Sequence, residues 1–269
     1  MSKRKKHLHP AAIKLLQYSF VTLFWLAVWV IAAHAVGEAL LLPSPFAVLK
    51  RLGELCLLPL FWKTVLTSLG RILYGVTLAI LLGSILATAT HFVPFLYTLF
   101  YPLITVIRTT PVASFIILAY LWIDRDTLPS FIAVLMVLPV VWANLHEALG
   151  AVDRDLLEMA KAYRFSPWKR FRRIYLPSVM PAFTASCRSS VGLAWKAGVA
   201  AEILIVPLVS IGKMLYESKL YLETTDLFAW TVTVILLSLL LELLLLSAVR
   251  VFNKRRRIRP KKTEVMHRG

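Results

Sequence analysis

Three ionisable residues stand inside otherwise apolar stretches of this chain: Arg108, Lys196 and Glu202. Placing one charge at the centre of a bilayer costs about 2.5–3.5 kcal/mol unless the charge is paired with another or hydrated. Such side chains can therefore mark the route of a polar solute, and the two cations weakly favour an anion. Structural ion pairing and snorkelling to the interface remain equally open interpretations. The candidates for this route are Arg108, Thr109, Thr110, Trp195, Lys196 and Glu202.

Residue patterns for catalysis or metal binding are missing from the sequence. The Gly212-Lys213 pair lacks the upstream glycine and the following Ser or Thr of a phosphate-binding loop, and His146-Glu147 is not completed to a zinc motif. The six histidines are scattered, and the two cysteines have no metal-ligand spacing. We therefore expect no catalytic residue, no metal ligand and no cofactor in this chain.

The composition excludes most soluble proteins. The 269 residues are 59% hydrophobic and 17% charged, with a mean hydropathy of +0.73 and a formal net charge of +17. An ordinary globular domain is about 45–50% apolar and about 25% charged. The basic residues concentrate at the two ends and in one central loop, which is the distribution of a membrane protein with these parts in the cytoplasm. Anionic lipid is thus a better partner for the basic tail than nucleic acid.

Six apolar segments predict an all-α, polytopic membrane protein with six transmembrane helices, because backbone groups in lipid must be satisfied within the segment. The first follows a basic run and could instead be a signal peptide, but its 19 apolar residues exceed the usual 7–15. The segments are Tyr18–Val36, Val65–Ala89, Leu96–Trp122, Phe131–Leu145, Phe183–Val206 and Leu227–Val249.

These segments divide the chain into a basic cytoplasmic N-terminus (1–17), a membrane domain (18–249) and a basic cytoplasmic tail (250–269). Pro102, Arg108 and Pro111 could split the third segment into an in-plane piece ending at Ile107 and a short spanning piece. Either arrangement still leads from one side of the membrane to the other, so the topology is unchanged.

Other charged and small residues in the segments have simpler explanations. Glu242 is expected to make an interhelical hydrogen bond, Arg188 to snorkel to the cytoplasmic interface, and Arg71 to lie near the outer boundary. Lys196 and Glu202 are about 240° apart on a helix and should not pair with each other. The spacings Ala194 to Gly198 and Ala197 to Ala201 favour close helix packing within one subunit over a pore-lining role.

The central loop predicts a helical hairpin over about 153–177. Acidic residues begin a first helix, Asp153 to Tyr163, and Leu156, Ala160 and Tyr163 share one face. Ser166-Pro167 then resembles an N-cap followed by a first-turn proline, starting a second helix that ends before Leu176-Pro177. An amphipathic anchor on the bilayer surface is the alternative.

The string EMAKAYRFSPWKRFRRIYLP, Glu158 to Pro177, resembles the cytoplasmic signature of ABC importer permeases: Glu-Ala-Ala, three residues, Gly, nine residues, then Ile-x-Leu-Pro. Met159 and Arg164 depart from that pattern. Because positive φ is uncommon outside glycine, either Arg164 avoids that conformation or Phe165 and Ser166 make the turn. The matching positions are Glu158, Ala160, Ile174, Leu176 and Pro177.

The resemblance covers nearly the whole chain and is greatest to the nitrate, sulfonate and taurine type of permease. It implies a type I ABC importer permease fold in which two permease copies, here a homodimer, form the pathway. Each hairpin would dock on one of two ATPase subunits, which bind ATP and Mg²⁺. The coupling residues would be Leu156, Glu158, Ala160, Ala162, Tyr163, Arg164, Phe165, Ser166 and Pro167. The further motifs are Leu42-Pro43-Ser44-Pro45, Thr67 to Arg71, Gly192 to Lys196, Ala200-Ala201-Glu202 and Ile211-Gly212.

An external substrate-binding protein or lipoprotein would deliver the solute. The outer segment 208–226 would form a gate and docking region, or else an interfacial helix held by Tyr216 and Tyr221. The expected substrate is a small anion such as nitrate, a sulfonate or taurine. The alternative is a vitamin or vitamin precursor of the thiamine-pyrimidine or riboflavin type. An ion channel or a secondary carrier is the alternative from another class.

Overall fold

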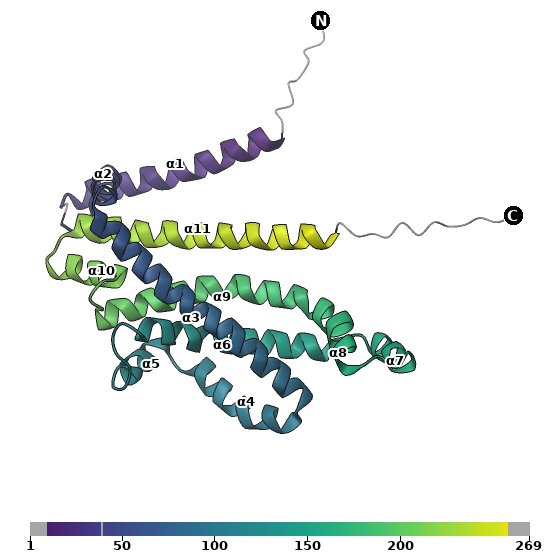
Figure 1. The fold of residues 1–269 in the computed structure, drawn as a ribbon. Helices are drawn as coiled ribbons and strands as arrows, with labels where there is room; N and C mark the ends of the chain where they lie inside the picture. Colours follow the sequence, from purple (N-terminus) through teal and green to yellow (C-terminus); the bar gives the residue numbers. More distant parts are fainter. Residues whose placement is uncertain (1–9, 39, 258–269) are drawn as a thin grey trace, which may run out of the picture. The chain divides into compact units, whose positions relative to one another are not determined.

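The computed structural model describes residues 10–38 and 40–257, and all regular structure within these ranges is helical (Figure 1). The basic residues before Pro10 and after Arg257, predicted to be cytoplasmic, lie outside the described residues. The elements are α1 (Pro10–Val36), α2 (Pro45–Cys56), α3 (Pro59–Phe92), α4 (Pro94–Thr109), α5 (Val112–Ala119), α6 (Leu128–Gly150), α7 (Arg154–Ala162), α8 (Pro167–Arg170), the π-helix η1 (Phe171–Tyr175), α9 (Leu176–Ile205), α10 (Ile211–Leu220) and α11 (Thr224–Arg257).

Among the described residues, four helices are long and apolar enough to cross a bilayer: α1, α3, α6 and α11. The pair α4 and α5 passes as one further span, bent by 105° at the break between them. Helix α9, at 30 residues, is also long enough, although Arg188, Lys196 and Glu202 make it less apolar. The helices are therefore compatible with six crossings, and the crossing by α9 stays a prediction.

The break in the third segment falls at Thr110, which is extended with φ −77° and ψ 133°. The residue before a proline is pushed away from the helical region, so Pro111 accounts for the break at this point rather than after Ile107. Thr90 of α3 meets Trp142 of α6, and Arg71 meets Ser130, so α3 and α6 run in the same direction. The chain between them must return from one end to the other, as predicted.

The described residues form two compact units. The larger comprises 63–213 and 234–257, and the smaller 10–38, 40–62 and 214–233. In the smaller unit, Arg51 of α2 donates from Nε and Nη2 to the two carboxylate oxygens of Asp226, at 2.6 and 2.8 Å. This hydrogen-bonded contact raises the already high pKa of Arg51, so the guanidinium stays charged at any physiological pH.

The core of the larger unit is built by small residues that let α3, α6 and α9 pack closely. A Cβ on Gly75 of α3 would lie 2.4 Å from the carbonyl oxygen of Ser130, and one on Gly198 would lie 2.6 Å from Ile72. Ala197 and Ala201 are buried against Leu128, Ile132 and other residues of α5 and α6. The small residues of α9 thus pack within the chain, as the sequence favoured.

Candidate functional site

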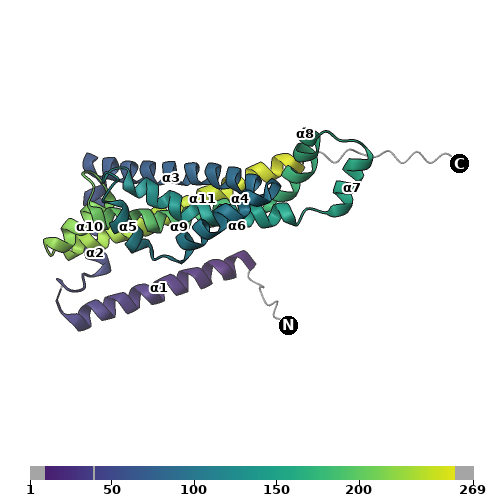
Figure 2. The ribbon, with the colours of Figure 1, turned by 90° about the horizontal axis from the view of Figure 1, so that it is seen from below.

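The predicted hairpin is present in the larger unit, where α7 and α8 extend beyond the ends of α6 and α9 (Figure 2). The Asp153 carboxylate caps α7 by accepting a hydrogen bond from the Asp155 amide at 2.9 Å. Ser166 Oγ accepts one from the Lys169 amide at 3.3 Å, and Pro167 occupies the first turn of α8. Both predicted helix starts are therefore confirmed.

The predicted end of the second helix is wrong, because α8 continues through η1 into α9 without interruption. The Leu176 amide donates to the Phe171 carbonyl five residues earlier, which is the wider π-helical spacing. Pro177 has no amide to donate, and a widened turn before it relieves the clash that proline makes with the preceding turn of an α-helix. The hairpin is thus joined to α9 by continuous helical backbone.

Arg164 makes the turn between the two helices with a φ of +48°. The Phe165 amide donates to the Ala160 carbonyl and the Arg164 amide to the Lys161 carbonyl, each at 2.9 Å. This pair of hydrogen bonds is a Schellman motif, which places its left-handed residue where glycine is usual. The arginine therefore adopts the conformation of the motif glycine instead of avoiding it.

A small apolar core holds the hairpin together. Ala160 is 1% exposed, and Leu157 and Phe165 pack against the same cluster. Leu156 and Tyr163, predicted to share the apolar face of Ala160, are instead 39% and 73% exposed. Of the three residues on the predicted face only Ala160 is covered within the chain, because Leu157 and Ala160 set the inward direction of α7. The buried members of the cluster are Leu149, Val152, Ala160, Ile174 and Tyr175.

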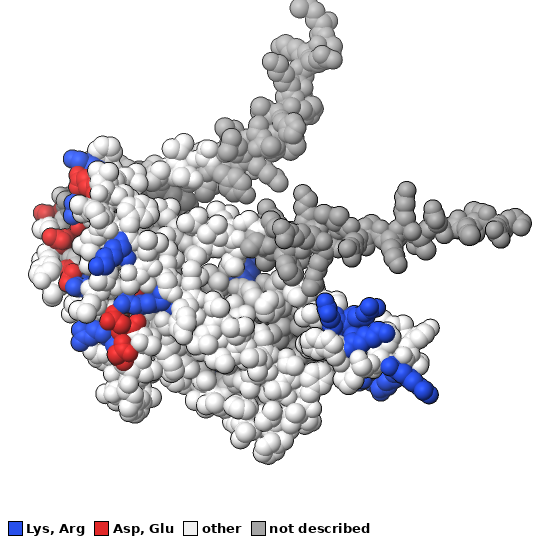
Figure 3. All heavy atoms as spheres, in the orientation of Figure 1, with Lys and Arg blue, Asp and Glu red and all other residues white. Residues whose placement is uncertain are grey.

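The opposite side of the hairpin presents apolar and charged side chains together. Glu158 and Ala162 are exposed one turn apart on α7, Met159 is 44% exposed, and Trp168 of α8 is 67% exposed. Ser166 and Pro167 are exposed in the connection. Basic side chains gather over this end of the larger unit (Figure 3). We call the exposed face of Leu156, Glu158, Met159, Ala162 and Tyr163 the hairpin surface.

The candidate route residues do not come together as one site. Arg108, Thr109 and Lys196 are exposed, and neither Arg108 nor Lys196 forms an ion pair with any residue that the structure describes. The hydroxyls of Thr109 and Thr110 donate to carbonyls of their own helix. Trp195 is 1% exposed, and its Nε1 donates to the Val234 carbonyl at 3.1 Å, which joins α9 to α11.

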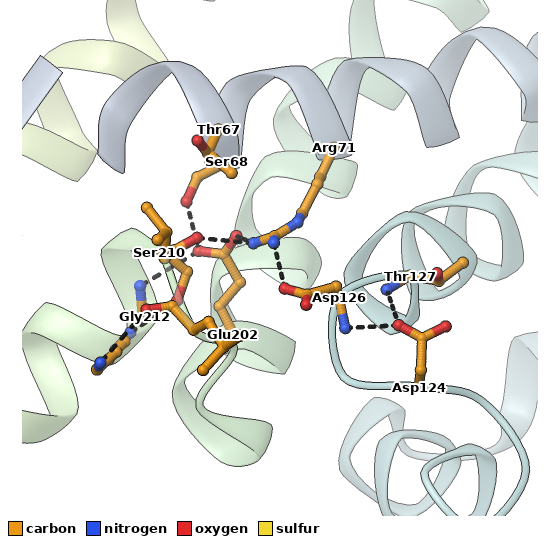
Figure 4. Close-up of polar contacts among 12 residues, drawn as sticks. Thr67, Ser68, Arg71, Asp124, Asp126, Thr127, Glu202, Ser210 and Gly212 are labelled. Carbon is orange, nitrogen blue, oxygen red and sulfur yellow. Dashed lines mark hydrogen bonds and ion pairs between the residues drawn. The ribbon is translucent and has the colours of Figure 1, made fainter. Parts of the chain in front are cut away.

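Glu202 is fully buried in a polar network at the C-terminal end of α9 (Figure 4). Its Oε2 accepts hydrogen bonds from Ser68 Oγ at 2.8 Å and from the Gly212 amide at 3.2 Å. Its Oε1 lies 3.9 Å from Nη1 of Arg71. Arg71 also donates to the Val209 carbonyl at 2.8 Å and pairs with Asp126. We call Ser68, Arg71, Asp126, Glu202 and Gly212 the α9 clamp.

The clamp fixes two loops at once. Through Gly212 and Val209 it holds the connection from α9 to α10, and through Asp126 it holds the loop before α6. Asp124 in that loop accepts hydrogen bonds from the amides of Thr127 and Asp126. Hydrogen bonding from Thr127, by its side chain first and then by its amide, lowers the pKa of Asp124. The expected separation of Glu202 from Lys196 holds, but the partners Arg71 and Asp126 were not found by sequence reasoning.

A second ion pair joins α9 to α11. Nη2 of Arg188 lies 3.2 Å from Oε1 of Glu242, and each side chain is 53% exposed. This is the interhelical bond expected for Glu242, with a partner that was expected only to snorkel. A cleft of about 500 Å³ opens beside the pair. No group of three metal-ligating residues occurs in the part of the chain that the structure describes.

Comparisons with known proteins agree with this architecture. Residues 79–258 match the family described as the binding-protein-dependent transport system inner membrane component. The bicarbonate transport system permease protein CmpB of Synechocystis is 30% identical over 161 residues, covering 59% of this chain and 57% of that protein. The nitrate import permease protein NrtB of Synechocystis is 28% identical, with 72% and 73% covered. The formylaminopyrimidine transport permease protein ThiX of Halalkalibacterium halodurans is 28% identical, with 64% and 70% covered.

The relatives are transport permeases, and the matched region contains α4 to α9 whole, with the hairpin, the clamp residues from Asp126 onward and the Arg188–Glu242 pair. The all-helical fold with several apolar spans is that of a multi-pass membrane protein. The chain therefore belongs to the family of binding-protein-dependent inner membrane components, the permease subunits of ABC importers.

Proposed function

We propose that this chain forms the solute pathway of an ATP-driven importer and that the hairpin surface binds a separate ATPase subunit. A second copy of the chain would complete the pathway, and an external binding protein would deliver the solute. Both termini would be cytoplasmic, on the same side as the hairpin. ATP and Mg²⁺ would be bound by the partner, because no phosphate-binding loop occurs in this chain.

The observation that carries the proposal is the hairpin surface itself. Met159 and Tyr163 are exposed on a helix whose inner side already packs against the hairpin core. Their exposure therefore leaves them available for contact with another protein. Exposed apolar groups rimmed by charges are typical of a protein interface. The side chain of Glu158 stands among them, where it can pair with a basic group of the partner.

The connection from hairpin to membrane can transmit movement. Because α8, η1 and α9 form continuous helical backbone, a displacement of the hairpin cannot be absorbed by a flexible loop on that side. A closing ATPase would thereby shift α9 and bias the pathway between its inward-open and outward-open states. The π turn at Phe171–Tyr175 is the point where the helix formed by α8, η1 and α9 can bend.

The substrate is proposed to be a small anion. Exposed Lys196 and Arg108 support this, and the chain is similar to relatives named for bicarbonate and nitrate. The similarity to a formylaminopyrimidine permease keeps a vitamin precursor as the second candidate. A channel or secondary carrier would need no hairpin surface for an ATPase.

The test compares Tyr163→Asp with Leu121→Asp, because these side chains are 73% and 72% exposed and lie at opposite ends of the larger unit. Each variant is purified from the native host through a tag on the chain. We expect Tyr163→Asp to reduce co-purified ATPase subunit by about tenfold or more, as for an interface anchor. Leu121→Asp should leave the amount unchanged.

Uptake of labelled bicarbonate and nitrate is measured in the same strains, with the level of the chain in the membrane as the control for folding. Loss of uptake should follow loss of the ATPase subunit. Retention of the ATPase subunit by both Tyr163→Asp and Met159→Asp would refute the assignment of the hairpin surface.

A further inference from the structure

The cleft between α9 and α11 is lined by polar and small side chains together with Val191, Leu245 and Leu246. Helix α11 is apolar enough to cross a bilayer, and α9 is predicted to do so. Arg188, Ser189 and Gly192 of α9 face Ser238 and Glu242 of α11. The cleft begins within about one helical turn of the contact between Trp195 and Val234, which holds the two helices together. Its volume of about 500 Å³ is within the range of sites for small molecules.

The ion pair in the cleft is placed differently from a structural pair. Arg188 and Glu242 each leave 53% of the side chain exposed, and the guanidinium uses only Nη2 on the carboxylate. Leaving charges half-exposed to hydrocarbon is unfavourable, whereas water or a polar solute in the cleft would solvate them. A guanidinium binds an oxyanion in a bidentate manner through Nη2 together with Nε or Nη1, so such a ligand would take the donor that Glu242 uses.

Small side chains on α9 leave the room for such a ligand. Ala185, Ser189 and Gly192 recur at helical spacing along the cleft, and Lys196 follows Ser189 by two turns and is exposed. The cations thus outnumber the anion along this face. A carboxylate already on Arg188 must be displaced when another anion binds, so Glu242 acts as a competitor for the same guanidinium.

We propose that this cleft is a binding site for the oxyanion group of a small solute, held by Arg188 in exchange for Glu242. The proposal deepens the proposed function by naming an intramembrane site and its ligand chemistry. It needs only that α9 and α11 lie in the membrane, and it does not depend on the hairpin surface.

The test measures the reactivity of a single cysteine in the cleft. Cys56 and Cys187 are replaced by alanine, and Ser238→Cys is introduced in the chain held in lipid nanodiscs. The matched control is Leu240→Cys, which is 50% exposed on the other side of α11. Anionic and cationic thiosulfonate reagents should modify position 238 and leave position 240 nearly unmodified, since thiolates form in water and not in lipid.

The charges of the pair should control the selectivity of this reaction. Arg188→Gln should lower the ratio of anionic to cationic modification rates by about tenfold, and Glu242→Gln should raise it by a similar factor. A pair with only a structural role, away from an aqueous site, would not give these opposite shifts.

Sodium nitrate, bicarbonate and ethanesulfonate are the ligand probes, with formylaminopyrimidine as the uncharged comparison. At least one anion should slow modification at position 238 about threefold at twice its dissociation constant, and Arg188→Gln should abolish that protection. Equal unreactivity at 238 and 240 would refute an aqueous cleft, and protection by formylaminopyrimidine alone would refute the oxyanion. Because co-purification of the ATPase subunit is measured separately, failure here leaves the proposed function standing.

Discussion

Helix α9 carries two ion pairs about 21 Å apart along its axis, and they differ in almost every physical respect. Glu202 is fully buried, with Ser68, Gly212 and Arg71 around it, whereas Arg188 and Glu242 are half-exposed beside a cleft. The first arrangement gives Oε2 of Glu202 two hydrogen bonds and sets Oε1, which accepts none from the described residues, 3.9 Å from the Arg71 guanidinium. The second leaves hydrogen-bonding capacity available, so a buried clamp and a binding site can use the same residue types.

Removing the carboxylate of the clamp should have the largest effect on stability. In Glu202→Ala, Arg71 loses a buried counter-charge and the Gly212 amide and Ser68 lose their acceptor. Breaking a buried pair in this way costs about 3–5 kcal/mol. Thermal unfolding in detergent micelles should show a large fall in Tm, or no folded chain at all.

The double variant Arg71→Ala with Glu202→Ala checks the cause. If uncompensated burial is responsible, removing both partners should cost less than the sum of the two single substitutions. Simple additivity would show that the two side chains do not depend on each other.

Filling the space beside Glu202 should have the next largest effect. A Cβ on Gly212 would lie 2.3 Å from the Cβ of Glu202 and 2.4 Å from its carbonyl carbon. Gly212→Ala must therefore push the backbone at position 212 away from Glu202, at a cost of about 1–3 kcal/mol. Gly53→Ala on α2, where nothing lies within 4 Å of the added Cβ, is the matched control and should raise Tm slightly, because alanine favours a helix interior over glycine.

The difference between these two pairs also shows what sequence can reveal. Each apolar run predicted a helix because lipid leaves the backbone no other partner, and Ser166-Pro167 predicted a helix start from local geometry alone. Arg71 and Glu202 are 131 positions apart, so their contact depends on α3 and α9 packing together. Glu242 could be assigned an interhelical bond because a lone carboxylate needs one, but Arg188 could not be identified as the partner.

The sequence likewise did not decide which residue makes the turn of the hairpin. Its position followed from the signature, but whether Arg164 or the residues after it made the turn depended on hydrogen bonds to Ala160 and Lys161. Helix periodicity groups Leu156 with Ala160 but does not show which of them is covered within the chain, because packing of Leu157 and Phe165 decides which side is inward. Local rules give the elements, and packing gives the exposed face.

Relieving the backbone strain at Arg164, in the turn of the hairpin, should raise the stability of the chain. In Arg164→Gly, a left-handed arginine is replaced by the residue that tolerates positive φ, and the free energy of unfolding should rise by about 1 kcal/mol or less. Arg164→Val should change it in the opposite direction, because a branched Cβ is least tolerated there. Thermal unfolding of the three chains in parallel is the measurement, and a fall in Tm for Arg164→Gly would contradict the strain.

The half-exposed pair should contribute little to stability, in contrast to the clamp. Arg188→Gln and Glu242→Gln should each change the free energy of unfolding by about 1 kcal/mol or less, as for pairs that solvent can reach. The same variants are the ones expected to change cleft selectivity. A loss as large as that of Glu202→Ala would remove the distinction between the two pairs.

Acid should weaken the loop next to the clamp, with the smallest effect of the series. Hydrogen bonds from Thr127 and Asp126 lower the pKa of Asp124 below its ordinary 3.8, so the carboxylate stabilises the folded chain fully above pH 3.8. That contribution is lost as the pH falls through the lowered pKa, where the folded state too takes up the proton. Asp124→Asn should therefore reduce Tm slightly at pH 7 and flatten its decline below pH 4. Because Asp124 is exposed while Asp126 pairs with Arg71, Asp126→Asn should reduce Tm more than Asp124→Asn at pH 7. The reverse order would show that Asp124, and not the contact between Asp126 and Arg71, holds this loop in place.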